Sequence, residues 1–189
     1  MLLAIDTSAG TGLAVVADGR VLAEASEAGT RRHAEAIGTL LAAALAEAGV
    51  APAGIDGVVA GMGPGPFTGL RVGIAAARAF AFARGIPVHP MVSHDAVAFG
   101  HEGRVLVVTD ARRREVAWSL YDAGVRLDGP HLAEREGFGG DPTARRIDAA
   151  EVSAASLGLA AEALLAAGRP LGPAEPLYLR PPDVTVASR

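Results

Sequence analysis

The sequence predicts an α/β fold built on the ribonuclease-H-like plan, and the order of its strands and helices carries that prediction. Three short apolar segments come first, at residues 2–5, 12–17 and 21–25. The last two are joined by Asp18-Gly19, a pair typical of tight hairpins. Strands and helices then alternate. Three antiparallel strands before the first crossover distinguish this plan from a doubly wound nucleotide-binding sheet.

Helical periodicity marks the first long helix, and an apolar strand follows it. Residues 33–48 place their apolar side chains on one helical face, and these are Ile37, Leu40, Leu41, Ala44, Leu45 and Ala48. Gly49 ends this run. Residues 57–61 are apolar throughout, as expected of a central strand covered on both faces.

The next elements complete a predicted N-terminal lobe over residues 1–100. We expect a helix at 69–84, a strand at 87–91, and a short helix at 93–99 with Ser93 as its N-cap.

A smaller, reduced C-terminal lobe is predicted over residues 101–189. Its expected strands lie at 104–109, 115–121 and 125–127, and its expected helix at 154–167. The proline-rich tail that follows should be extended and pinned by Leu177, Tyr178 and Leu179.

Composition excludes several classes of protein. Half of the 189 residues are apolar and a fifth are charged, which argues against disorder, and the net charge of −4 argues against strong direct binding of nucleic acid. The absence of cysteine excludes disulfides and thiolate nucleophiles. The apolar start of the chain is too short for a signal peptide, and no apolar run is long enough to span a bilayer. We therefore expect a cytoplasmic protein without membrane contact.

Residues 61–73, here called the glycine elbow, are the most distinctive stretch of the chain. Five glycines and two prolines lie between a predicted strand and a predicted helix, with Thr68 as the expected N-cap. Such a loop either cradles a phosphate or is a tight strand-to-helix turn. A P-loop is excluded because that motif requires a lysine, and the chain has none.

The end of the first strand carries Asp6-Thr7-Ser8, which allows two interpretations. The carboxylate could hold Mg²⁺ beside a phosphate, or it could accept backbone amides in a turn. A phosphotransferase would also need a second acidic residue after another strand, and Asp110 is the only candidate. An ATP-binding kinase or ATPase is therefore kept as the alternative function.

No metal site, cofactor site or catalytic residue is predicted. The five histidines, which form no ligand motif, are His33, His89, His94, His101 and His131. No Gly-x-Ser-x-Gly nucleophile motif exists either. The basic turn at residues 112–114 is a solvated loop or a contact for RNA or for an acidic patch of a partner.

One face of the predicted helix at 69–84 suits contact with another protein. Leu70, Ile74, Ala77 and Ala81 should face the sheet, which leaves Arg71, Ala75, Arg78 and Phe82 on the other side. We call these last four residues the outer stripe. Small residues around an exposed Phe and two Arg favour close helix packing, although scattered surface residues are the other interpretation.

Several blocks along the chain closely resemble the TsaB (YeaZ) family. They are Ala4-Ile5-Asp6-Thr7-Ser8, the run from Gly63 to Gly73, Ala79-Phe80-Ala81, Gly85-Ile86-Pro87-Val88, Asp110-Ala111-Arg112 with Glu115-Val116, and Pro176-Leu177-Tyr178-Leu179-Arg180. The resemblance implies an actin-like ATPase fold of two ribonuclease-H-like lobes.

The same resemblance implies a non-enzymatic subunit of the complex that makes N6-threonylcarbamoyladenosine in tRNA. In that complex the paralogue TsaD is catalytic and TsaE is a small ATPase. The resemblance implies pairing with TsaD through helices of the N-terminal lobe, which here means the outer stripe and the helix that begins at His33. A homodimer and a monomer are the two alternatives for the chain when TsaD is absent.

The chain differs from TsaD at one motif and departs from the TsaB family in one region. Where TsaD has the metal-binding run His-Met-Glu-Gly-His, this chain reads Pro90-Met91-Val92-Ser93-His94, so only one ligand remains. The stretch between the strand at 115–121 and the last helix is short, and we expect the second lobe to lack a helix and a strand.

Overall fold

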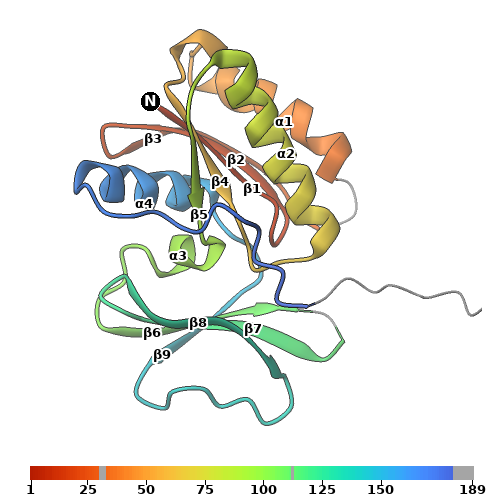
Figure 1. The fold of residues 1–189 in the computed structure, drawn as a ribbon, viewed down its shortest axis with the longest axis vertical. Coiled ribbons are helices and arrows are strands. Elements are labelled where there is room, and N and C mark those ends of the chain that lie inside the picture. The colour runs from red at the N-terminus through yellow and green to blue at the C-terminus, as the bar shows by residue number, and fades with distance from the viewer. Residues whose placement is uncertain (30–32, 112, 181–189) are drawn as a thin grey trace, which may run out of the picture.

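The computed structural model describes residues 1–29, 33–111 and 113–180, and it contains two β-sheets with helices packed on and between them (Figure 1). The first sheet has the order β3-β2-β1-β4-β5. Its strands are β1 (Leu2–Asp6), β2 (Thr11–Ala17), β3 (Arg20–Glu27), β4 (Gly57–Gly61) and β5 (Val88–Met91). The first three strands pair antiparallel, and β4 and β5 pair parallel to β1 and β4, respectively. This topology confirms the predicted ribonuclease-H-like plan.

Helices cover both faces of the first sheet. One face packs against α1 (His33–Glu47) and α2 (Phe67–Arg84). Between these two helices the chain forms a short 3-10 turn (Pro52–Gly54) and then β4. The other face packs against α4 (Ala154–Ala166), and α3 (Ser93–Ala98) packs on α4. Because apolar side chains are buried on both faces, β1 and β4 are buried along their whole length.

The second sheet repeats the first four strands of the first sheet. It has the order β8-β7-β6-β9, in which β6 pairs antiparallel with β7 and parallel with β9. Its strands are β6 (Arg104–Asp110), β7 (Glu115–Asp122), β8 (Val125–Glu134) and β9 (Arg145–Ala149). Within the described residues it has no fifth strand, and no helix connects β8 to β9. The fold is therefore an actin-like ATPase fold with a shortened second half.

The two faces of the second sheet are covered differently. Its inner face buries Val105, Val107 and Tyr121 against α3, which lies between the two sheets (Figure 1). Its outer face packs against the loop between β8 and β9, to which Phe138 belongs. A loop thus lies over the face that a longer lobe would cover with helices.

The last helix returns to the first sheet. Although α4 follows β9 in sequence, it packs against β1 and β2. Glu162 accepts hydrogen bonds from the backbone N–H groups of Asp18 and Gly19, and Glu24 accepts one from Ala155 at the start of the helix.

The boundary between an N-terminal lobe ending at residue 100 and a C-terminal lobe beginning at residue 101 stays a proposal.

Two predicted N-caps are wrong. Helix α2 begins one residue before Thr68, because the carbonyl of Pro66 accepts the first helical hydrogen bond, from Leu70 N–H, and Pro66 takes the cap position. Helix α3 is preceded by Val92 as its cap. Ser93 does not cap α3 because its hydroxyl donates to Asp6, and a buried carboxylate is the stronger acceptor.

Candidate functional site

The glycine elbow packs directly on the turn that follows β1. A Cβ atom added to Gly65 would lie 2.7 Å from the Cα atom and the carbonyl oxygen of Ser8, and one added to Gly73 would overlap Thr7. The Thr7 hydroxyl donates to the carbonyl of Gly69 at 2.8 Å. Glycine is therefore required here for close contact within the chain, which is the turn interpretation of the elbow.

The carboxylate of Asp6 lies at the centre of this contact. Asp6 is 2 % exposed, and its Oδ1 accepts hydrogen bonds from the backbone N–H and the hydroxyl of Ser8, at 2.8 and 2.6 Å. Its Oδ2 accepts from the Ser93 hydroxyl at 2.5 Å, and that hydroxyl in turn accepts from Gly63 N–H. Both oxygens of Asp6 thus bind groups of the protein itself.

This arrangement does not fit a bound magnesium nucleotide. Mg²⁺ needs a carboxylate oxygen that faces solvent or phosphate, whereas the Asp6 carboxylate is buried and hydrogen-bonded. The elbow lies against residues 7 and 8, where a phosphate would have to enter.

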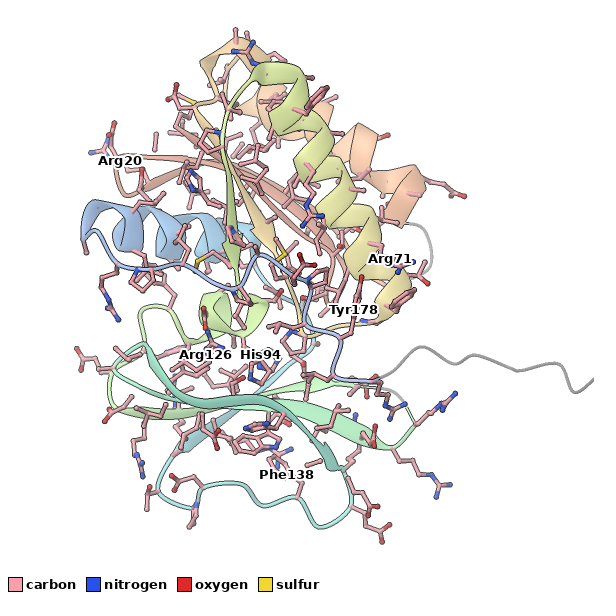
Figure 2. The ribbon with its side chains drawn as sticks, viewed as in Figure 1. Arg20, Arg71, His94, Arg126, Phe138 and Tyr178 are labelled. Atoms are coloured by element: carbon pink, nitrogen blue, oxygen red, sulfur yellow. The ribbon has the colours of Figure 1, made fainter. Side chains whose placement is uncertain are left out.

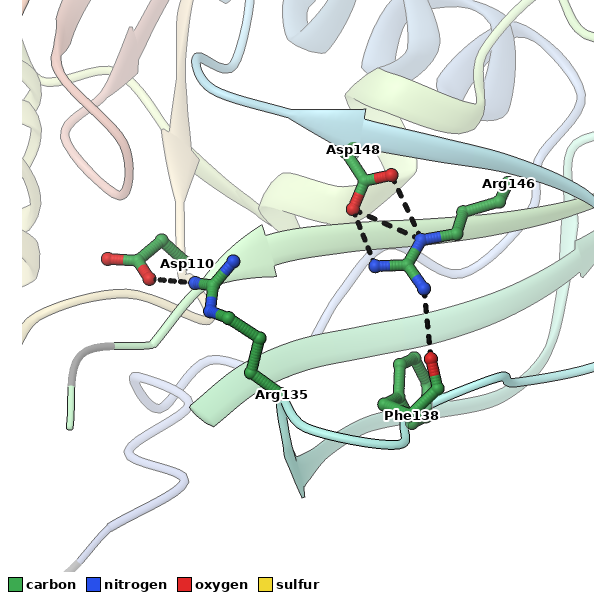
Figure 3. Close-up of polar contacts among 5 residues, drawn as sticks. All are labelled: Asp110, Arg135, Phe138, Arg146 and Asp148. Atoms are coloured by element: carbon green, nitrogen blue, oxygen red, sulfur yellow. Dashed lines mark hydrogen bonds and ion pairs between the residues drawn. The ribbon is translucent and has the colours of Figure 1, made fainter. Parts of the chain in front are cut away.

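Asp110, the second acidic residue that a kinase would need, is also engaged. It lies exposed at the end of β6, and its Oδ1 accepts a hydrogen bond from the guanidinium of Arg135 (Figure 3). Nearby, Arg146 binds both carboxylate oxygens of Asp148 and donates to the carbonyl of Phe138. These contacts tie the loop between β8 and β9 to the second sheet and present no pair of open carboxylates.

His94, the one metal ligand of the TsaD run that this chain keeps, is a buried structural histidine. His94 lies between the first sheet and the second (Figure 2). Its Nδ1 lies 2.8 Å from the hydroxyl of Ser119 and its Nε2 lies 2.9 Å from that of Thr109. Burial, and secondarily the positive charge of Arg126, lowers the pKa of His94 to about 3. The ring is therefore neutral and holds α3 to the second sheet.

His89, His101 and His131 each have different surroundings. His89 is on β5, where burial lowers its pKa, His101 contacts Arg145, and His131 binds Asp128. Over residues 1–29, 33–111 and 113–180, no group of three or more acidic or histidine side chains is placed to hold a metal ion.

A buried polar cluster lies beside His94. The Tyr121 hydroxyl donates to the Asp95 carboxylate at 2.7 Å, and Arg126 Nε lies 3.3 Å from the same oxygen. Burial raises the pKa of Asp95, although its contacts with Arg126 and Tyr121 oppose that shift. This cluster joins α3 to β7 and β8, and sequence patterns did not predict it.

The outer stripe is exposed, as the helical periodicity predicts. Leu70, Ile74, Ala77 and Ala81 are buried against the sheet, while all four outer-stripe residues face outward. Phe82 is the extreme case, with 90 % of its surface exposed. His33 begins α1, and its side chain falls outside the described part of the chain.

The C-terminal segment reaches the outer stripe, a contact that the sequence analysis missed. The Tyr178 hydroxyl accepts a hydrogen bond from Arg71 Nε at 3.2 Å, and the Arg71 guanidinium lies 3.7 Å from the centroid of the Phe67 ring. The carbonyl of Ala174 accepts from Arg78 Nη2 at 3.1 Å. The pinning of the tail is confirmed, since Leu177 N–H donates to the carbonyl of Met62.

Two further sequence predictions concern the basic turn at residues 112–114 and membrane-spanning helices. In the basic turn, Arg113 and Arg114 are exposed and have left-handed backbone angles, and Arg112 lies outside the described residues. Among the helices of the described residues, none has the length and apolar character needed to cross a membrane.

Comparison with protein families gives a match to the model described as TsaD, tRNA N6-adenosine threonylcarbamoyltransferase, over residues 20–150. An uncharacterised Mycobacterium tuberculosis protein is 41 % identical over 197 residues, which cover 96 % of this chain and 92 % of that protein. An uncharacterised Mycobacterium leprae protein is 48 % identical over 135 residues, but the match spans only 38 % of its length and 69 % of this chain.

Two further comparisons identify the branch of this family. The tRNA threonylcarbamoyladenosine biosynthesis protein TsaB of Bacillus subtilis is 31 % identical over 124 residues, covering 64 % of this chain and 54 % of that protein. The crystal structure of YeaZ from Pseudomonas aeruginosa superimposes with a TM-score of 0.74 at 27 % identity, covering 94 % of this chain and 99 % of that one. The chain belongs to the TsaB (YeaZ) family of tRNA threonylcarbamoyladenosine biosynthesis proteins.

Proposed function

We propose that this protein is a non-catalytic subunit that binds and activates TsaD, the transferase that modifies tRNA. The observation that carries the proposal is the outer stripe. Phe82 projects from α2 with 90 % of its surface in solvent; Arg78 lies one turn before it, and Ala75 and Arg71 lie further along the same exposed face. A large exposed aromatic side chain on a face that carries arginines has the composition of an interface hot spot.

The neighbouring helix supports the same surface. On α1, the outward-facing residues Ala42, Ala43 and Ala46 are small and exposed. Small side chains allow a partner helix to approach closely, while Phe82 supplies apolar area. A helical surface of a paralogue with the same fold suits this geometry, and the helix that begins at His33 belongs to the proposed contact.

The proposal that the chain is not an enzyme rests on the contacts of its two candidate nucleotide-site carboxylates. The Asp6 carboxylate is buried under Ser8 and Ser93, and Asp110 binds Arg135. The alternative, an ATP-binding kinase or ATPase, lacks an observation in its favour. Titration calorimetry with Mg-ATP tests it, because a Kd tighter than about 100 μM, or about −5.5 kcal/mol, would revive that alternative.

Further associations belong to the same proposal. We propose in addition that the chain binds TsaE and acts in the cytoplasm, and that the outer stripe is the surface available for a homodimer when TsaD is absent; the likeness to TsaB proteins supports these proposals. Strong direct binding of nucleic acid is not proposed, since the net charge is −4.

The test is the affinity for TsaD from the same organism, measured by titration calorimetry for the wild type and for Phe82→Asp. We expect Phe82→Asp to weaken binding by about 30-fold or more, because a charge replaces a central apolar contact. The melting temperature should not change, since Phe82 makes few contacts within the chain.

Leu127→Asp is the matched control. Leu127 is also an exposed apolar residue, at 51 %, but it lies on β8 of the second sheet. Its substitution should leave the affinity unchanged. Equal affinities of wild type and Phe82→Asp would refute the proposed surface.

A further inference from the structure

The segment of residues 171–180, here called the strap, connects parts of the molecule that are distant in sequence. After α4 it crosses the ends of β5 and β4 and reaches the start of α2 (Figure 1). Gly172 N–H donates to the carbonyl of Pro90, and Leu177 N–H donates to that of Met62, both at 2.8 Å. At its end, Arg180 forms an ion pair with Glu115 on β7.

The strap holds both arginines of the outer stripe. Arg78 donates through one Nη2 hydrogen to the Ala174 carbonyl, and Arg71 donates through Nε to the Tyr178 hydroxyl. The rings of Phe67 and Tyr178 lie 4.8 Å apart, and the Arg71 guanidinium contacts the face of Phe67 (Figure 2). A cation on an aromatic face with a fixed Nε–H has little rotamer freedom left.

These contacts leave donors of both arginines unused. Within the described part of the chain, neither guanidinium is paired with a carboxylate, and no residue accepts from either Nη group of Arg71. Both side chains are exposed. Each therefore presents oriented N–H groups on the face that also carries Phe82, and such forks match carboxylates.

We infer that the strap is a positioning element that orients Arg71 and Arg78 to receive carboxylates of the protein partner while Phe82 enters an apolar recess beside them. The inference rests on the proposed function and names the chemistry of the partner surface, which is an apolar recess with acidic side chains on one side. Tyr178 is the positioning residue, because it acts through Arg71. Ordering these side chains before binding lowers the entropy cost of association.

The test is a double-mutant cycle on the full-length chain with TsaD from the same organism. Tyr178→Phe keeps the ring on Phe67 and Arg71 and removes only the hydroxyl acceptor. We expect it to weaken binding about fivefold, which corresponds to the net contribution of one typical hydrogen bond. In the Arg71→Ala background the same change should have no further effect, because the group through which Tyr178 acts is gone.

The salt dependence of the affinity for TsaD, together with a control variant, distinguishes positioning of the arginines from a purely structural role of the strap. The affinity of the wild type should fall as the salt concentration rises. This fall should be smaller in Arg71→Ala and in Arg78→Ala, because each substitution removes a charge from the contact. Tyr121→Phe removes a hydroxyl of the same kind at a buried position far from the outer stripe. It should lower the melting temperature without changing the affinity of the folded protein.

Two results would overturn the inference, and they are distinguishable. If wild-type chain binds TsaD but Tyr178→Phe binds equally well, or if the Tyr178 and Arg71 effects add, the strap does not position the arginines and the proposed function stands. If the wild-type chain does not bind TsaD at all, both the proposed function and this inference fail.

Discussion

The buried His94 makes a specific prediction about stability and pH. In the folded protein its ring is fully buried between the hydroxyls of Ser119 and Thr109, and its pKa is lowered to about 3 from an ordinary 6.5. As pH falls below the ordinary value, the unfolded chain binds a proton that the folded chain does not. The free energy of unfolding should therefore decrease with falling pH until the folded pKa is reached.

The size of this effect follows from linkage. Each pH unit between the two pKa values costs about 1.4 kcal/mol for one proton. Between about pH 7.5 and about pH 5, the pKa values of 6.5 and about 3 give a loss of about 2 kcal/mol from His94 alone. This loss is a substantial part of the stability of an ordinary domain.

The assay compares wild type with His94→Gln. Glutamine retains a donor and an acceptor for the two hydroxyls but does not titrate. Asp95, whose pKa is raised, acts in the opposite direction, but it is present in both proteins and cancels in the difference. Urea unfolding followed by the fluorescence of Trp118, the only tryptophan, measures the free energy of unfolding at each pH.

Parallel curves of the free energy of unfolding against pH for wild type and His94→Gln would refute this account. If wild type and His94→Gln lose the same free energy of unfolding on acidification, His94 protonates freely in the folded protein. Its ring would then be accessible, and its assignment as a structural residue would be wrong.

Two further substitutions and one control test the packing of the glycine elbow and the polar cluster. Gly65→Ala should destabilise the fold by about 2 kcal/mol or more, because its Cβ would lie 2.7 Å from the backbone of Ser8, which cannot move aside; Gly38→Ala in α1, with open space around it, should stabilise by about 1 kcal/mol. Equal melting temperatures for the two variants would contradict the close contact. Asp95→Asn should lower the free energy of unfolding by about 1 kcal/mol in urea unfolding, because it removes the ion pair of the half-buried Arg126. An unchanged unfolding midpoint would show that water already solvates the charge of Arg126.

The sequence predicted the first sheet well because its strands and helices have strong local signals. The burial pattern of α2 follows directly from helical spacing at Leu70, Ile74 and Ala77. The hairpin at Asp18-Gly19 has the left-handed backbone that its sequence suggests. In these elements local preference and tertiary contact agree.

The second sheet was predicted less completely, since part of it depends on contacts rather than on local pattern. Strand β9 was missed because Arg145, Arg146 and Asp148 make it look like a charged loop, yet it pairs in parallel with the buried strand β6. Strand β8 extends to Glu134, although its apolar start alone suggested a short segment. Main-chain pairing with a neighbouring strand overrides weak propensity at such an edge.

The candidate site was also predicted only in part. Spacing on one helix predicts that Arg71 and Phe82 share an exposed face, but no local pattern reveals that Tyr178, more than a hundred residues later, binds Arg71. The Asp6 carboxylate was ambiguous for the same reason. Its identity as a packed structural group depends on Ser93, which the fold brings to it from 87 residues away.

The most direct test of the central claim is the N6-threonylcarbamoyladenosine content of tRNA from cells that lack this gene and carry either the wild-type or the Phe82→Asp chain. The account predicts that the wild-type chain restores the modified nucleoside and that Phe82→Asp, although folded and equally abundant, does not. Full restoration by Phe82→Asp would contradict the claim that this protein acts by presenting the outer stripe to its partner.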